Sequence, residues 1–134
     1  MKINRIEHMC EGNGHVIIKE LLDEQQLNGK CGLYAGGQGH TLVKRLLDEK
    51  QLNGKCKLYA QVTLEPGCSL GFHMHYGESE TYYILTGEGE YNDNGTSWRH
   101  VKAGDITFTP DGRGHGLANT GNTDLVFMAL IIKD

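Results

Sequence analysis

Two short patterns of glycine, histidine and glutamate constrain this chain more than any other feature. The first pattern places its metal-binding chemistry on His73, His75 and Glu80. Residues two apart on a β-strand point to the same face, so the imidazoles of His73 and His75 can reach one ion. The polar stretch 76–79 predicts a hairpin turn, and the aromatic and β-branched run 81–85 predicts the return strand that brings Glu80 close to His75.

The second pattern adds one more histidine from a distant part of the chain. His115 follows the stretch 110–114, which is rich in proline and glycine and predicts a loop. Neutral imidazole and carboxylate groups are ligands that suit Zn, Fe, Mn, Ni or Co. The sequence therefore predicts a metal centre with one divalent metal per chain, and the identity of the metal stays open.

Taken together, the two patterns resemble the two motifs of the cupin superfamily. The first motif is Gly, five residues, His-x-His, three or four residues, Glu, six residues and Gly; the second is Gly, five residues, Pro-x-Gly, two residues, His, three residues and Asn. This chain matches both motifs in order, with 16 residues between them. The matching residues are Gly67, His73, His75, Glu80, Gly87, Gly104, Pro110, Gly112, His115 and Asn119.

The resemblance covers roughly residues 55–132 and carries several expectations. It implies an all-β fold, namely an antiparallel β-barrel of jelly-roll type. It also implies that the metal is held by His73, His75, Glu80 and His115. Glu78 competes for the carboxylate position, but only Glu80 lies seven residues before Gly87.

An internal repeat is the second unusual feature of the chain. Residues 12–35 align with residues 37–60 at an offset of 25, and 17 of the 24 positions are identical. We interpret the repeat as a tandem duplication. Each copy predicts a strand, a loop with an Asn-Gly turn and a second strand, although the string at 46–52 also favours a short helical turn.

The second copy continues without a break into the first histidine pattern. We therefore assign residues 37–134 to the cupin β-barrel domain and residues 1–36 to an N-terminal extension. The first copy has strand character but no place in its own barrel, so it should extend a sheet edge or pair with a neighbouring subunit. The resemblance to cupins, together with the repeat, implies a homodimer with N-terminal strand exchange; the alternative is a loosely attached, partly disordered segment.

Further β-strands are expected around the metal centre. Runs 87–91 and 98–101 flank a turn at 92–95, and further strands are expected at 105–109 and 125–132. Strand alternation places Tyr82 on the Glu80 face.

Two residues are candidates for catalysis. The phenol of Tyr82 can donate a proton or a hydrogen bond beside the metal, although core filling explains it equally well. Arg113 lies in the loop two residues before His115 and offers a planar fork for a carboxylate or phosphate, unless it is a solvated loop charge. Asn119 is interpreted as a structural member of its motif. Four other histidines are interpreted as surface residues: His8, His15, His40 and His100.

Charge and composition exclude several classes of partner. The net charge is −4 and no basic residues cluster, so nucleic acid is not an expected partner. No run of about 18 apolar residues predicts a membrane span, and the N-terminus lacks an apolar signal core. Four cysteines without a C-x-x-C pattern indicate free thiols in a reducing compartment. We therefore expect a cytoplasmic protein.

Four protein ligands leave one or two positions open on a five- or six-coordinate metal, and an open position is typical of a catalytic site. By resemblance, we expect a metal-dependent enzyme of the dioxygenase, decarboxylase or isomerase type that acts on a small oxygen-rich or anionic metabolite. The first alternative is a non-catalytic, metal-dependent protein that binds or senses a small molecule. The second is a structural protein whose metal only stabilises the fold.

Overall fold

The computed structural model describes residues 2–7, 15–20 and 41–134. These residues form strands and no helix, and hence no helix that could cross a membrane. The strands are β1 (Lys2–Glu7), β2 (His15–Glu20), β3 (Thr41–Arg45), β4 (Cys56–Leu64), β5 (Ser69–Met74), β6 (Glu78–Thr86), β7 (Glu88–Asp93), β8 (Ser97–Lys102), β9 (Ile106–Thr109), β10 (Gly114–Ala118) and β11 (Leu125–Lys133).

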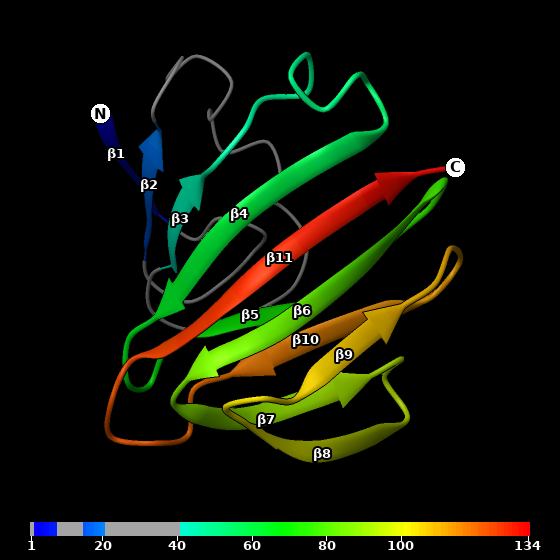
Figure 1. Ribbon diagram of the computed structural model, residues 1–134. Coiled ribbons are helices and arrows are strands. Elements are labelled where there is room, and N and C mark those ends of the chain that lie inside the picture. The colour runs from blue at the N-terminus through cyan, green and yellow to red at the C-terminus, as the bar shows by residue number, and fades with distance from the viewer. Residues whose placement is uncertain (1, 8–14, 21–40) are drawn as a thin grey trace.

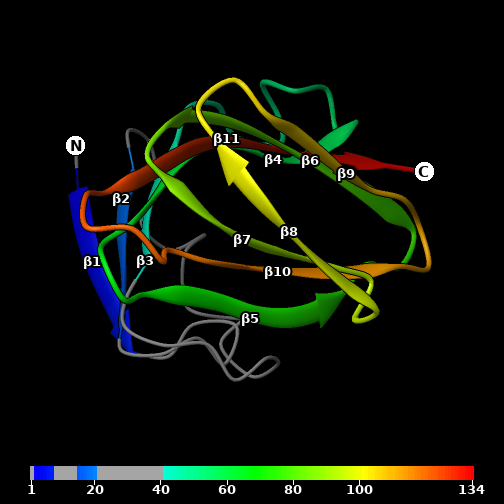
Figure 2. The same ribbon diagram turned by 90° about the horizontal axis from the view of Figure 1, so that it is seen from below.

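The strands form two sheets that face each other, as Figures 1 and 2 show. One sheet has the order β1-β2-β3-β4-β11-β6-β9, and the other has the order β5-β10-β7-β8. Neighbouring strands are often far apart in the chain, as with β4 beside β11 and β5 beside β10, and all but one of the pairings are antiparallel. The all-β jelly-roll architecture predicted from the sequence is therefore confirmed.

The core lies between the two sheets because successive side chains of a strand point to opposite faces. On β11, the side chains of Leu125, Phe127 and Ala129 are buried, and their partners on β4 are also buried. The register pairs Phe127 with Val62 and Ala129 with Ala60, so apolar rows run across the sheet. Strand alternation thus fixes which residues face the space between the sheets.

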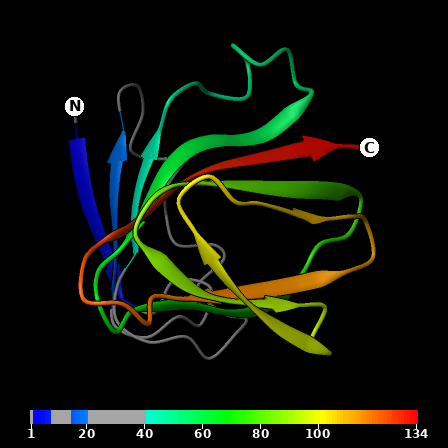
Figure 3. The ribbon, with the colours of Figure 1, turned by 60° about the horizontal axis from the view of Figure 1, so that its bottom comes forward.

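The first repeat copy extends the edge of the larger sheet, which was one of the two places predicted for it. Strand β2 pairs in parallel with β3, and these two strands lie side by side in Figure 3. Ile17 lies opposite Leu42, which is the repeat offset of 25. β3 then pairs antiparallel with β4 through Val43 and Val62. The second strand predicted for the first copy, at 31–35, lies outside the described residues.

One local expectation differs from the structure, and two are met. The string at 46–52 forms a short helical turn, in which the backbone N–H of Leu52 donates to the carbonyl oxygen of Asp48 at 3.1 Å, and Asp48 and Gln51 exchange hydrogen bonds between side chain and backbone. The turn expected at 76–79 is shorter, because β6 already begins at Glu78, which pairs with Lys133 of β11. The Asn53-Gly54 turn forms as expected, with φ values of 58° and 67° at the two residues.

Candidate metal centre

Four side chains from both sheets meet in the space between them. His73 on β5 lies directly opposite His115 on β10, so the strand register sets these two imidazoles side by side. Glu80 reaches the same point from β6 in the other sheet. His75 follows the end of β5 and is held by a hydrogen bond from its backbone N–H to the carbonyl oxygen of Arg113. This bond joins the two sequence patterns at the site.

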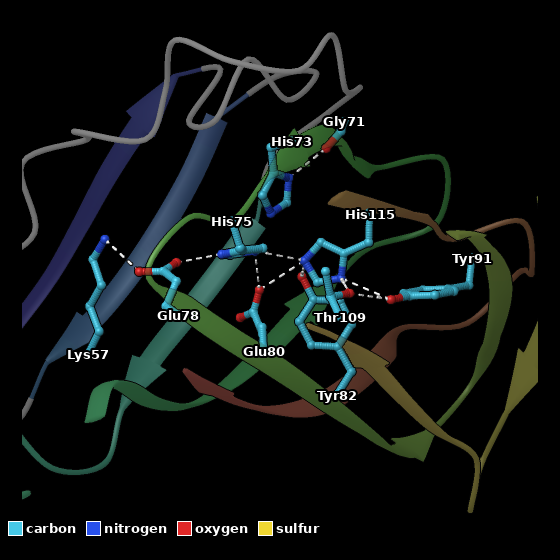
Figure 4. Close-up of polar contacts among 10 residues, drawn as sticks. All are labelled: Lys57, Gly71, His73, His75, Glu78, Glu80, Tyr82, Tyr91, Thr109 and His115. Carbon is cyan, nitrogen blue, oxygen red and sulfur yellow. Dashed lines mark hydrogen bonds and ion pairs between the residues drawn. The ribbon is translucent and has the colours of Figure 1, made fainter. Parts of the chain in front are cut away.

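The ligand atoms of these side chains converge, as Figure 4 shows. The Nε2 atoms of His75 and His115 are 3.1 Å apart. One carboxylate oxygen of Glu80 lies 3.0 Å from His75 Nε2 and 2.9 Å from His115 Nε2. With His73 included, one ligand atom from each residue lies within 4.8 Å of the others, and all four residues are buried.

The outward nitrogen of each imidazole has a hydrogen-bond partner of its own. Nδ1 of His73 donates to the carbonyl oxygen of Gly71 at 2.8 Å, and Nδ1 of His75 donates to the carboxylate of Glu78 at 2.5 Å. Nδ1 of His115 faces the hydroxyl of Thr109 at 2.8 Å. A proton on Nδ1 leaves Nε2 with a bare lone pair, which is the form of histidine that binds a metal.

This donor set fits a divalent cation. Bare Nε2 lone pairs about 3 Å from one another and from a carboxylate repel each other unless a positive charge lies among them. Two ligand atoms that bind one ion at right angles, each about 2.1 Å away, lie about 3.0 Å apart. The separations among His75, His115 and Glu80 match this spacing. The cluster of His73, His75, Glu80 and His115 could therefore hold one metal ion.

Burial and hydrogen bonding set the charge of the cluster. Burial, together with the nearby His115, lowers the pKa of His73 to about 4, so its imidazole is neutral near pH 7. Burial alone would raise the pKa of Glu80, but without a metal Nε2 of His115 and of His75 can carry a proton, and hydrogen bonds from these nitrogens then lower the pKa of Glu80 to about 2. Burial opposes the charge of His75 too, yet hydrogen bonds and charges from Glu80 and Glu78 raise its pKa above the ordinary value. Glu80 is thus a carboxylate at neutral pH.

Glu78 has a role that the sequence patterns did not assign to it. Its carboxylate contacts Nδ1 of His75 on one side and the ammonium group of Lys57 at 3.2 Å on the other. Lys57 lies where the pairing of β4 with β11 shifts between Ile131 and Ile132, and such a bulge turns a side chain toward the site. Carboxylates that hold the outer nitrogen of a ligand histidine fix its ring and its tautomer. The short spacing of three residues between His75 and Glu78 could have indicated this contact, but the sequence was interpreted as a turn at 76–79.

Aromatic and hydroxyl groups surround His115. The ring of Tyr82 stacks on that imidazole with centroids 4.7 Å apart, and its hydroxyl lies 3.3 Å from His115 Nε2. Tyr91 and Thr109, which sequence reasoning missed, hydrogen-bond to each other at 2.8 Å and both contact His115 Nδ1. Thr109 pairs directly with Glu80 where β9 lies beside β6, a contact between distant strands that the sequence does not reveal.

Other residues considered from the sequence lie further from the cluster. Arg113 is exposed, and its backbone lies beside His75 at one end of the site. The amide of Asn119 donates to two backbone carbonyls and accepts from Gly121, which fits the structural role expected of it. His100 is on the surface as expected, paired with Glu90 at 2.6 Å. The side chains of His8, His15 and His40 lie outside the described residues.

Comparison with known proteins points to one family. The model of the cupin domain family matches residues 60–131, a segment that contains all four clustered side chains. In sequence, the chain is 42% identical to the oxalate-binding protein of Thermotoga maritima over 128 residues, which cover 96% of this chain and 84% of that protein.

Two further similarities agree with this family. Oxalate decarboxylase OxdC of Bacillus subtilis is 30% identical over 79 residues, which cover 56% of this chain but only 20% of that protein. The crystal structure of a predicted oxalate decarboxylase from Thermotoga maritima superimposes with a TM-score of 0.77 and 36% identity. That alignment covers 100% of this chain and 94% of that one.

Proposed function

Since the chain belongs to the cupin family, we propose that it binds one divalent metal ion through His73, His75, Glu80 and His115, and that the metal binds a small dicarboxylate of the oxalate type. Zn, Fe, Mn, Ni and Co all suit this donor set. When bound, the ion supplies positive charge and a Lewis acid for carboxylate oxygens. The residues around the cluster hold the ligand side chains in place and exclude water from them.

One ligand nitrogen from each of His73, His75 and His115 lies within 4.8 Å of a carboxylate oxygen of Glu80, and this convergence carries the proposal. A divalent ion neutralised by a single carboxylate keeps one net positive charge, which favours an anionic ligand. A ligand with two adjacent carboxylates offers both the charge and paired oxygens. The relative named as an oxalate-binding protein supports oxalate as the first ligand to test.

Calorimetric titration of metal-loaded and metal-free protein tests the proposal. We expect oxalate to bind the metal-loaded protein at least ten-fold more tightly than acetate, because acetate has only one carboxylate. The metal-free protein should not bind oxalate measurably. Equal oxalate affinity with and without metal would contradict the proposal.

Decarboxylation is the second candidate function, and the position of Tyr82 favours it. In this reaction the C–C bond of oxalate breaks, one carboxylate leaves as CO2, and a proton takes its place on the remaining carbon to give formate. The Tyr82 hydroxyl, 3.3 Å from His115 Nε2, lies where a proton donor could act. OxdC supports this reaction class. If the protein is a decarboxylase, the wild type should release formate, and Tyr82→Phe should release at least ten-fold less at equal metal content. If the wild type releases no formate, ligand binding is the function that remains.

We also propose that Arg113 helps to attract the anion, since its backbone lies beside His75 and its side chain is free to reach the solvent. Replacing Arg113 with alanine should raise the Kd for oxalate about ten-fold, or about 1.4 kcal/mol. The metal content should not change, because Arg113 is not a ligand. Replacing Lys102, another exposed cation, is the control. An unchanged Kd in the Arg113 variant would remove this residue from the site.

Further proposals concern the whole chain. We propose that residues 37–134 are the cupin domain and residues 1–36 an N-terminal extension, and that two copies form a homodimer by exchanging N-terminal strands. The edge position of β1 and β2 supports exchange, because the same edge of a partner copy would accept them. The free thiol of Cys56 supports a cytoplasmic location.

A further inference from the structure

The imidazole of His115 differs from the other two clustered histidines in what holds its outer nitrogen. Nδ1 of His73 faces a backbone carbonyl oxygen and Nδ1 of His75 faces a carboxylate, and both of these groups only accept hydrogen bonds. Nδ1 of His115 instead faces two hydroxyl groups, those of Thr109 at 2.8 Å and Tyr91 at 3.1 Å. A hydroxyl both accepts and donates, so it does not by itself decide which nitrogen of His115 carries a proton.

The carboxylate of Glu80 competes for the proton of this imidazole. One of its oxygens lies 2.9 Å from Nε2 of His115 and only accepts hydrogen bonds, so it draws the single proton of a neutral ring to Nε2. A nitrogen that carries a proton has no lone pair for a metal ion. Neutral His115 therefore becomes a ligand when its proton is on Nδ1, and Nδ1 then needs an acceptor, because an unpartnered N–H is costly in a buried site.

The two hydroxyl groups are arranged to supply that acceptor. They lie 2.8 Å apart, and Thr109 and Tyr91 are 2% and 1% exposed (Figure 4). When Thr109 accepts from Nδ1 of His115, its own O–H can donate to Tyr91. Tyr91 is restrained in turn, because the guanidinium group of Arg99 lies 5.6 Å from the centre of its ring and donates to the carbonyl oxygen of Ile106 at 3.1 Å.

We propose that Thr109, with Tyr91 behind it, is a positioning residue of the metal centre that accepts the Nδ1 proton of His115 and so leaves Nε2 free for the ion. The inference rests on the proposed metal binding and assigns a role to residues that are not ligands. Partners of this kind are typically worth about 10- to 100-fold in metal affinity. A neutral hydroxyl belongs at the lower end of this range, because hydrogen bonds between neutral groups are weaker than those to charged groups.

The Kd for Zn²⁺ of the full-length protein, measured by competition with a chelator, tests the proposal with two substitutions at residue 109. Thr109→Val keeps the shape of the side chain and removes the hydroxyl, so its Kd should rise about ten-fold. Thr109→Ser keeps the hydroxyl and removes a buried methyl group, so its Kd should stay close to the wild-type value while its melting temperature falls. A role in packing alone would give the opposite order.

Thr107→Val is the matched control for the loss of a buried hydroxyl. Thr107 lies on β9 as Thr109 does, is 1% exposed, and its hydroxyl has no hydrogen-bond partner among the described residues. This variant should keep the wild-type Kd for Zn²⁺. Tyr91→Phe is a second test variant: it removes the hydroxyl behind Thr109 and should raise the Kd by a smaller factor. Melting curves of the metal-free variants show that each one folds.

The outcomes separate this inference from the proposed function. If the wild type binds zinc and Thr109→Val and Tyr91→Phe bind it equally well, the inference is overturned and the metal site stands. A loss of affinity in Thr109→Ser as large as in Thr109→Val would overturn it too, because the oxygen would then not matter. A wild type that binds no zinc would contradict both proposals, whereas failure to bind oxalate would contradict only the proposed ligand.

Discussion

At the scale of single residues, the site depends as much on the groups behind the histidines as on the ligand atoms. His73, His75 and His115 each use Nδ1 in a hydrogen bond and turn Nε2 inward. A ring held in this way needs no rearrangement when the metal binds. The carboxylate of Glu78 is the partner with the largest expected effect, because it bears a charge and is itself nearly buried beside His75.

Replacing Glu78 with alanine should lower metal affinity by about 10- to 100-fold, since His75 loses the group that fixes its ring and tautomer. Competition with a chelator measures this affinity. Glu90→Ala is the matched control, because Glu90 also contacts a histidine, His100 at 2.6 Å, but far from the cluster. Wild-type affinity in the Glu78 variant would show that the contact with His75 is incidental.

At the scale of strands and turns, the motif glycines hold the connections in place for different reasons. Gly87 has a φ of +85°, and a Cβ added there would lie 2.4 Å from the carbonyl oxygen of Asp124. Gly104 has a similar φ of +93°, but nothing lies within 4 Å of its added Cβ. A side chain at residue 87 would therefore add a steric clash to the backbone strain, whereas a side chain at residue 104 would cause backbone strain alone.

We expect Gly87→Ala to reduce the free energy of unfolding by about 3 kcal/mol or more, and Gly104→Ala by about 1 kcal/mol. Urea denaturation of the two variants gives both values. The difference between the two losses of unfolding free energy measures the cost of the clash between residue 87 and the chain just before β11. Equal losses in the two variants would show that the chain at Asp124 moves aside without cost.

The strands of the cupin domain followed from alternation and turn chemistry, which are local. The turn at Asn53-Gly54 and the strands expected at 87–91 and 98–101 were therefore predictable. Contacts between distant strands were not: Tyr91 and Thr109 reach His115 only because β7, β9 and β10 surround it. Glu78 was missed because local polarity favoured a turn, whereas pairing with β11 extends the strand.

At the scale of the whole molecule, the N-terminal strands are proposed to hold two copies together. β1 and β2 lie at one edge of the larger sheet, whereas β6, which carries Glu80, lies next to β9 at the opposite edge. The proposed exchange is therefore separable by deletion from the residues of the metal cluster.

Deleting residues 1–36 should leave a folded protein that keeps its metal, because β3 retains its pairing with β4 through Val43 and Val62. Association should weaken, since the strands proposed for exchange are lost. Sedimentation velocity and metal analysis of the deleted and full-length chains measure both effects. A deleted chain that fails to fold would place residues 1–36 within the domain instead of outside it.

Metal content in a single-ligand variant tests the central claim most directly. Elemental analysis of unstripped wild-type protein should find one divalent ion per chain, and His115→Ala should hold at least ten-fold less. Its melting temperature should also fall, because a metal that binds only the folded state stabilises it by mass action. His100→Ala, a histidine outside the cluster, should keep the full metal content. Full occupancy in a folded His115→Ala protein would contradict the account.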